Sequence, residues 1–502
     1  RRGPPPKGPP PLKRGRGRPR KARPPPDAPP QDAHATPVRK RGRPPKNRPG
    51  PVPTEERHIA SATDNTGGTS EGPARSAPNG GSVVIIVGDH FNGVREILGE
   101  TWVLHMEGDK IVRFYRVDDD AIDTGTYTYD FRGKYVLPGL VDCHVHPALS
   151  TEDYQKASMV MSHGEKALLA QRRLLEMADY GWTTVRVAGD PGIGCPSLDV
   201  RDHFKQFQVV APRVVGAGHY ISVTGGGGDL NQLRNTQCRC LENVDGLIAD
   251  GKEAMIKCVR QEVQDGADWI KILASGAYMS AGDDPTRPHF SAEELAGIME
   301  ESGRRNVPVM AHCHAADSIV MCADAGVRSI EHASFLDERG TRAILKRRGS
   351  DNECFIVPTL LVGDWFTRNS SPSGAQAKML RLQEEKDRTV FQNLHRGIVQ
   401  HGVRFCVGTD YVGWQVGENW KELRLLVEKV GLEAHQVLVA ATSAAGEMLR
   451  MPIGRLQPTY LADFIVVERS PLERQFESLS VRPHRVCIGG RFRPMELLVP
   501  YL

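Results

Sequence analysis

Residues 138–146 read Pro-Gly-Leu-Val-Asp-Cys-His-Val-His, an apolar run that ends in two histidines, His144 and His146. The length and character of this run are typical of a strand buried on both faces. Side chains two positions apart in a strand point to the same side, so the two imidazoles share one face. The stretch predicts the first strand of a parallel sheet, with its chemistry at the C-terminal end.

Seven more apolar runs follow, at 183–189, 213–221, 268–275, 307–314, 327–333, 355–362 and 403–410. Amphipathic helical patterns separate most of them, and the clearest lie at 165–181, 252–266 and 377–402. Near-continuous apolar strands that alternate with helices are typical of parallel sheets covered on both faces. Eight such strands predict an α/β fold, a closed (β/α)8 TIM barrel, over residues 138–455.

Short β-type patterns flank this region on both sides, at 83–137 and 456–502. Within the first segment, Glu107-Gly108-Asp109-Lys110 separates two β-rich runs and is a hairpin signal. We expect the two flanking segments to come together as one small β domain beside the barrel.

The first fifty of the 502 residues differ sharply from the rest. They carry 16 Lys+Arg against two acidic residues, a net +14, whereas the remainder carries −10. They also hold 16 of the 36 prolines, and Gly, Ser and Thr are frequent from about residue 50 to 82. Such a segment has little apolar surface to bury, so residues 1–82 are expected to be a disordered tail and linker.

No apolar run approaches the ~20 residues that cross a bilayer, which argues against a membrane protein. The ten cysteines are scattered, as in a reduced protein. The expected location is cytoplasmic, with the nucleus as the alternative suggested by the basic tail. Residue 1 shows no signal-peptide pattern, but the chain does not begin with Met, so an earlier leader stays open.

Metal-binding residue types occur at the predicted C-terminal strand ends, where a barrel carries its functional side chains. His312 and His314 end the fifth strand, His332 the sixth and Asp410 the eighth. Imidazoles and carboxylates bind zinc and similar divalent ions. A single such histidine is usually a polar core residue, whereas an ordered set indicates a metal site. For His314, metal binding and support of another ligand both remain open.

Lys271 lies between Ile270 and Ile272 in the fourth predicted strand. Burial lowers the pKa of a lysine, and an uncharged amine can react with carbon dioxide to form a carbamate that bridges two metals. The alternatives are an ion pair with Asp268 or Asp283, or a side chain that extends to solvent. The metal hypothesis is favoured because Lys271 belongs to the ordered set.

The motifs resemble the amidohydrolase superfamily, in its imidazolonepropionase-like branch with Xaa-Pro dipeptidases and fungal ochratoxin-cleaving amidases. The resemblance covers about residues 83–495 and rests on LPGLVDCHVH, GADWIKILASGAYMS, VPVMAHCHAADSI, GVRSIEHASFLD and GTD. It implies that the flanking strands form a split β-sandwich. It departs at Gly227, where the family commonly has a histidine, and this places the substrate in doubt.

The resemblance also implies roles for the site residues. His144 and His146 would bind one ion, His312 and His332 the second, and carboxylated Lys271 would bridge them. Asp410 would contact the first ion and act as the catalytic proton shuttle. His314 would line the substrate pocket.

These residues predict an enzyme, a metal-dependent amidohydrolase that cleaves a small C–N amide with a hydroxide shared by two ions, expected to be zinc. Dipeptides, N-acyl amino acids and related amides fit. His219 or Tyr278 would stabilise the oxyanion, and Tyr220, Tyr278 and Arg287 are candidates for binding a substrate carboxylate. The alternatives are a cyclic-amide or phosphoester hydrolase, or a chromatin-associated protein whose barrel is a scaffold. A homo-oligomer is expected.

Two short motifs in the tail are the basis of the chromatin-associated, DNA-binding alternative. Arg16-Gly17-Arg18-Pro19 and Arg41-Gly42-Arg43-Pro44 resemble AT-hooks, in which an extended Arg-Gly-Arg lies in the minor groove of A·T-rich DNA. A generic basic tail that attracts polyanions is the competing hypothesis, and an artefact of the gene start is a third.

Overall fold

The computed structural model describes Gly3 and residues 82–118, 128–150, 157–158, 160–190, 192, 194–229, 247–278, 280, 283–369 and 389–494. Both Arg-Gly-Arg-Pro motifs lie outside these residues. So does the segment 377–388 of the helix predicted over 377–402.

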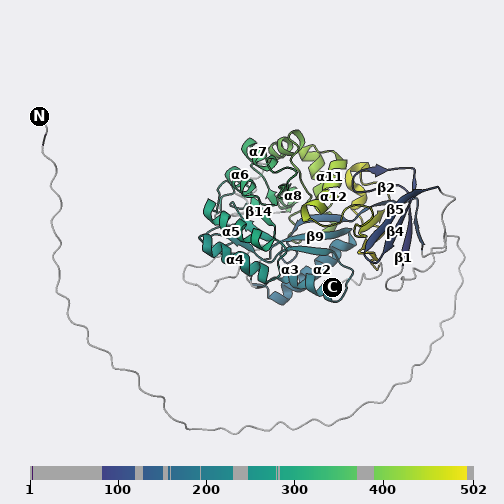
Figure 1. Cartoon of the computed structure of the whole chain (residues 1–502), viewed down its shortest axis with the longest axis horizontal. Helices are drawn as coiled ribbons and strands as arrows, with labels where there is room; N and C mark the ends of the chain where they lie inside the picture. Colours follow the sequence, from purple (N-terminus) through teal and green to yellow (C-terminus); the bar gives the residue numbers. More distant parts are fainter. Residues whose placement is uncertain are drawn as a thin grey trace, which may run out of the picture. The chain divides into compact units, whose positions relative to one another are not determined.

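The central region alternates parallel strands with helices (Figure 1). Its strands are β8 (Leu140–Val145), β9 (Trp182–Ala188), β10 (Arg213–Ala217), β11 (Tyr220–Ser222), β12 (Leu247–Ile248), β13 (Ile270–Leu273), β14 (Val309–Cys313), β15 (Ser329–His332) and β16 (Phe355–Val357). Its helices are α2 (His163–Asp179), α3 (Pro196–Gln206), α4 (Lys252–Gln264), α5 (Ala292–Arg305), α6 (Ala316–Ala325), α7 (Glu338–Leu345), α8 (Leu360–Asn369), η3 (His395–Gln400), η4 (Val416–Glu418), α10 (Lys421–Leu425), η5 (Leu426–Val430), α11 (Ala434–Ala440) and α12 (Ser443–Leu449).

Local sequence explains where two of the longer helices begin. Ser162 caps α2 and Ser291 caps α5, each by accepting a hydrogen bond from the backbone N–H three residues on. Glu165 and Glu294 complete the two capping boxes by accepting from the cap backbone. Of the helices predicted from the sequence, the pattern at 165–181 corresponds to α2 and the pattern at 252–266 corresponds to α4.

The parallel ladders form two sheets, β10-β9-β8 and β12-β11-β13-β14-β15-β16. A few backbone hydrogen bonds connect their edges. At one junction Trp269 N–H donates to Gly216 O at 3.1 Å. At the other, residues 404–407 contact both neighbours, since Ile356 N–H donates to Arg404 O and Cys143 N–H to Val407 O, each at 2.9 Å. The arrangement is TIM-barrel-like, whereas a continuous closed ladder of eight strands stays a prediction.

The third predicted strand, 213–221, is divided into β10 and β11. The interruption falls at Gly218 and His219, whose backbone N–H groups both donate to Glu262 of α4 at 2.9 Å. Because a carboxylate takes these two donors, they are not used in a strand ladder.

The flanking segments form two further sheets, β5-β4-β1-β6 and β19-β18-β17-β7-β2-β3. Their strands are β1 (Ser82–Val87), β2 (His90–Phe91), β3 (Glu96–Ile97), β4 (Thr101–Glu107), β5 (Lys110–Val117), β6 (Thr128–Phe131), β7 (Tyr135–Pro138), β17 (Phe464–Val467), β18 (Arg485–Ile488) and β19 (Arg491–Phe492). The predicted hairpin is confirmed, with Glu107 opposite Lys110. Strands β7 and β17 pair although more than three hundred residues separate them. The exact domain boundaries remain predictions.

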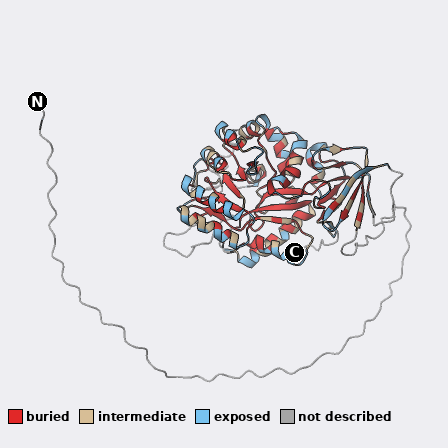
Figure 2. Ribbon diagram, in the orientation of Figure 1, coloured by how far each residue is buried: buried red, intermediate tan, exposed pale blue. Residues whose placement is uncertain are grey.

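Burial follows this arrangement: most of the central strands are buried, whereas the outer faces of the helices are exposed (Figure 2). Every residue of β8, β9, β13, β14 and β15 is buried. Polar side chains on these strands are therefore held away from bulk water, and each needs a hydrogen-bond or ion-pair partner inside the protein. Among the described residues, no helix has the length and apolar character needed to span a membrane.

Candidate metal centre

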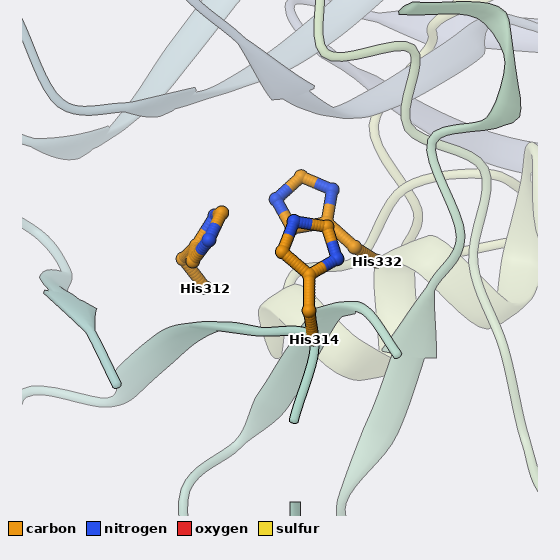
Figure 3. A group of neighbouring side chains, drawn as sticks. All are labelled: His312, His314 and His332. Atoms are coloured by element: carbon orange, nitrogen blue, oxygen red, sulfur yellow. The ribbon is translucent and has the colours of Figure 1, made fainter. Parts of the chain in front are cut away.

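The strand ends bring the predicted ligands together in two groups. Ligand atoms of His144, His146 and Asp410 lie within 4.8 Å of one another, and so do those of His312, His314 and His332. Figure 3 shows the second group, with His312 and His314 rising from one strand segment and His332 from a neighbouring element.

The two groups adjoin each other. The ring centroids of His144 and His332 are 5.2 Å apart, and those of His312 and His332 are 4.6 Å apart. Asp410 Oδ1 lies 3.4 Å from Nε2 of both His144 and His146. The six predicted metal-binding residues all line one cavity.

A hydrogen bond to one ring nitrogen orients each histidine. Nδ1 of His144 donates to Glu331 Oε2 and Nδ1 of His146 to Gly189 O, both at 2.7 Å. Nδ1 of His332 shares a hydrogen bond with the Thr359 hydroxyl at 2.6 Å. This is the arrangement of metal-binding histidines, in which an outer partner fixes the ring and its tautomer.

The remaining two histidines follow the same rule. His312 donates through Nε2 to Gly276 O at 3.2 Å, so its Nδ1 is the nitrogen left for a ligand. His314 bonds Ser334 Oγ through Nδ1 at 2.7 Å. Its ring stacks on that of His332 at 4.7 Å. His314 therefore lies both among the potential ligands and on the cavity wall, and its two predicted roles remain open.

Burial favours the neutral form of three of the imidazoles. Burial lowers the pKa of His144, His312 and His332 well below the usual range, and neighbouring cationic groups lower it further. Burial alone would raise the pKa of Asp410, but His144 and His146 outweigh it and the pKa is lowered. At neutral pH the site thus offers imidazole lone pairs beside a carboxylate, a donor set that fits divalent zinc-like ions.

Lys271 lines the same cavity and is 2% exposed. Its Nζ is 3.4 Å from His144 Nε2. Burial lowers the pKa of the amine to about 8, although Glu331 and Asp410 oppose the shift. The proposed alternatives have other partners: Asp268 binds Arg201 at 2.8 Å, and Asp283 binds His289 at 3.0 Å.

Sequence reasoning missed the support beneath His144. Arg186 on β9 is fully buried and its guanidinium lies 2.9 Å from Glu331 of β15. Glu331 in turn accepts from His144. A charged residue inside the apolar run 183–189 was the available signal, because a buried guanidinium needs a buried carboxylate.

Three residues around the site have left-handed backbone, with φ of 69° at His332, 53° at Thr359 and 53° at Asp410. Such conformations cost of order 1–3 kcal/mol for residues other than glycine and cluster where geometry matters for function. His332 ends β15, Thr359 follows β16 by two residues, and Asp410 ends the strand predicted over 403–410, so the backbone turns there as it presents the side chain.

The cavity has a volume of about 280 Å³. The predicted substrate residues Tyr220, Tyr278 and His314 line it. His219 and Arg287 are not among the described lining residues. His219 Nδ1 donates to Glu262 at 2.8 Å, and Arg287 binds Asp284 with its side chain 80% exposed.

Apolar and charged groups at the wall were also missed by sequence reasoning. Many of the lining side chains are apolar, including Leu149, Leu273, Pro358, Leu360, Val362, Phe366, Val390, Phe391, Val412 and Leu425. Lys429 of η5 adds a cation to the wall. Gly227 also lines the cavity, and a Cβ there would lie 2.9 Å from Asp283 Oδ2, so the turn is packed too closely for a side chain.

Comparison with known proteins places this site in a family. Residues 135–493 match the model of the amidohydrolase family. Ochratoxinase of Aspergillus niger is 31% identical over 359 residues, which cover 68% of this chain and 72% of the relative. Imidazolonepropionase of Hahella chejuensis is 23% identical, over 77% of this chain and 92% of the relative.

Solved structures with a similar fold come from the same kinds of enzyme. A Xaa-Pro dipeptidase with methionine bound in its active site superposes with a TM-score of 0.73 at 25% identity, covering 82% of this chain and 99% of that one. The A. niger ochratoxinase structure gives 0.70 at 26% identity, over 83% and 96%. The fold is thus TIM-barrel-like α/β, and the predicted branch is confirmed. The chain belongs to the amidohydrolase family and is a hydrolase of amide carbon–nitrogen bonds.

Proposed function

We propose that the protein is a binuclear metal-dependent amidase that cleaves a small amide, such as a dipeptide or an N-acyl amino acid. The observation that carries the proposal is the convergence of His144, His146, Lys271, His312, His332 and Asp410 on one cavity. In His144, His146, His312 and His332, a hydrogen bond engages one ring nitrogen and leaves the other for an ion.

The residues divide by position. His144, His146 and Asp410 would hold one ion, and His312 and His332 the other, with Lys271 as a carbamate between them. When bound, the two ions supply Lewis acidity toward the amide carbonyl and lower the pKa of water from near 16 to about 7. Zinc fits the imidazole and carboxylate donors.

Asp410 is the proposed proton shuttle. It lies at the cavity wall, and His144 and His146 hold its carboxylate in the ionised form. An ionised carboxylate at this position accepts a proton from the attacking water and delivers it to the leaving amine. Tyr278, which contacts His314 with ring centroids 4.6 Å apart, is placed to orient the carbonyl oxygen.

The cavity favours an apolar substrate with one acidic group. Its many apolar side chains suit an aromatic or aliphatic body, and Lys429 is a cationic partner for a carboxylate at the wall. Relatives named ochratoxinase and Xaa-Pro dipeptidase support a small amide rather than a protein substrate.

Metal analysis combined with a substrate screen tests the proposal. The screen contains dipeptides, N-acyl amino acids, cyclic amides and phosphoesters. We expect chelator-sensitive hydrolysis of one of the first two classes, and a loss of about two ions per chain in His144→Ala and in His312→Ala. A protein that binds no metal and hydrolyses nothing would leave the barrel as a scaffold, whereas turnover of phosphoesters alone would favour the alternative chemistry.

For the tail we propose A·T-rich DNA binding through Arg16, Arg18, Arg41 and Arg43. This proposal rests on the sequence of the two motifs, which lie outside the described residues. Homo-oligomer formation likewise stays a prediction.

A further inference from the structure

A second cluster of metal-ligand side chains lies apart from the cavity. Cys195 immediately precedes α3, His219 lies between β10 and β11, and Asp265 follows α4. Their ligand atoms lie within 4.8 Å of one another. Cys195 and His219 are buried and Asp265 is exposed. None of the three is among the described residues that line the cavity.

We propose that Cys195, His219 and Asp265 form an additional binding site for a thiophilic divalent cation such as zinc. Thiolate, imidazole and carboxylate together supply two negative charges and one neutral nitrogen. The thiolate favours zinc or cobalt over magnesium and calcium, which prefer oxygen ligands. Three protein ligands leave a fourth position for water on the side of the exposed carboxylate.

Glu262 holds His219 in the orientation that a metal ligand needs. Its Oε1 accepts from His219 Nδ1 at 2.8 Å, while its Oε2 accepts the backbone N–H groups of Gly218 and His219. With Nδ1 used as a donor, Nε2 is the nitrogen left for an ion. A carboxylate behind the imidazole is the usual support of a metal-binding histidine.

The two buried ligands lie close to each other. Cys195 Sγ lies 3.6 Å from His219 Nδ1 and 4.0 Å from Nε2. Tetrahedral zinc, with bonds of about 2.3 Å to sulfur and about 2.0 Å to nitrogen, separates its sulfur and nitrogen ligands by about 3.6 Å. Because Sγ lies nearer to Nδ1 than to Nε2, binding would require the thiol to shift along the ring toward Nε2.

Gly218 leaves room for the sulfur. A Cβ at this position would lie 2.4 Å from Cys195 Sγ and 3.3 Å from a Glu262 oxygen. Any side chain would displace the thiol from the cluster. The absence of a side chain at residue 218 thus permits Cys195 to approach His219.

Binding of the cation exchanges protons for metal. The Cys195 thiol and any proton on His219 Nε2 are released to solvent, while Nδ1–H stays with Glu262. Burial raises the pKa of the Cys195 thiol, so at neutral pH the metal-free thiol is protonated. A thiolate at this residue at neutral pH accordingly reports the bound cation.

Cobalt(II) substitution of the full-length protein is the direct test, because cobalt bound to thiolate gives a near-ultraviolet charge-transfer band. None of the proposed catalytic ligands is a cysteine. We expect the band in the unmodified protein, its loss in Cys195→Ser together with one metal equivalent, and its weakening in Gly218→Ala. Cys258→Ser, which removes a thiol from the same helix as Glu262, should keep the band.

Absence of the band from the cobalt-loaded unmodified protein would overturn the proposal, and this result does not depend on any variant being folded. Persistence of the band in folded Cys195→Ser would overturn it as well. The outcome is independent of the catalytic proposal, since loss of hydrolysis in His144→Ala should leave the band in place.

Discussion

Lys271 Nζ lies 3.4 Å from Nε2 of His144, although both side chains are almost completely buried. An ammonium in this position would be desolvated. It would also face the His144 imidazole, which burial keeps neutral. The lowered pKa of both groups reflects this conflict. The proposed carbamate on Lys271 would resolve it, because the cation would become an anion next to the proposed metal ligands.

Lys271→Ala should abolish the bridge between the proposed metal sites. We expect hydrolysis to fall by at least about 100-fold with a loss of bound metal, because alanine supplies neither the two oxygens nor the charge. Added short carboxylic acids such as acetate should restore part of both, and metal content and kcat measured with and without acetate check this. Full activity of the variant without rescue would show that Lys271 does not bridge.

Glu331→Gln tests the support beneath His144 without removing a proposed ligand. Glutamine keeps the shape but loses the charge that binds Arg186 and His144, so we expect metal affinity to fall about 10- to 100-fold. Titration of the metal-free protein with zinc measures the change. At saturating metal the variant should recover most of its kcat, whereas a loss that excess metal leaves unchanged would indicate a role in the chemical step.

The sequence predicted which candidate ligands lie together, whereas it missed the residues around them, and the reason is physical; their role as ligands stays a prediction. His144, His312, His332 and Asp410 were recognisable because strand ends in an α/β barrel point to one face, a property of each strand by itself. The pairing of Arg186 with Glu331 joins residues 145 positions apart and depends on which strands become neighbours. No local pattern contains that information.

Two of the predicted substrate-binding residues are not among the described residues that line the cavity, and their roles stay predictions. His219 was placed by its position after the third strand, but the buried Glu262 of α4 draws it and the adjacent backbone toward the helix. Arg287 was chosen for its charge, and it instead remains at the surface beside Asp284. Lys429 went unnoticed because an exposed lysine on a helical segment is ordinary in sequence.

Glu422→Gln should change how stability depends on pH. Burial raises the pKa of Glu422 from its usual 4.5 to about 8, against the opposing hydrogen bonds from Leu360 and Leu361. The folded state therefore binds more protons than the unfolded state between these pH values. The contribution of Glu422 to the free energy of unfolding is fully present below pH 4.5 and is lost as pH rises through 8.

Denaturant unfolding of both proteins from pH 5 to about 9 measures this effect as a difference. Glutamine resembles the protonated carboxyl and cannot ionise, so the variant should gain stability relative to the unmodified protein as pH increases. Glu253→Gln, at an exposed position of α4, serves as the control and should show a constant difference. A constant difference for Glu422→Gln would contradict the raised pKa.

Lys429→Met should alter substrate selection rather than the chemical step. The ammonium at the cavity wall is the proposed partner of a substrate carboxylate, and a hydrogen bond to a charged group contributes about 1.5–3 kcal/mol. We expect KM for acidic amides to rise about tenfold or more, with little change in kcat. Substrates with an esterified carboxylate should be hydrolysed equally by both proteins, and an equal loss on both would assign Lys429 to structure.

Deletion of residues 1–81 should separate the tail from the enzyme. Strand β1 begins at Ser82, so this deletion spares the folded strands. The deletion removes the +14 of residues 1–50 from a chain whose remainder is acidic, and we expect hydrolysis to be unchanged while DNA binding disappears. In the full chain, DNA affinity should fall steeply with salt, because phosphate neutralisation dominates such contacts.

Replacing Arg16, Arg18, Arg41 and Arg43 with alanine should erase any preference for A·T-rich over G·C-rich duplex, measured by competition at fixed salt. A chain with no such preference before replacement would have a generic basic tail, and a truncated protein that folds but no longer hydrolyses amides would show that the two parts depend on each other.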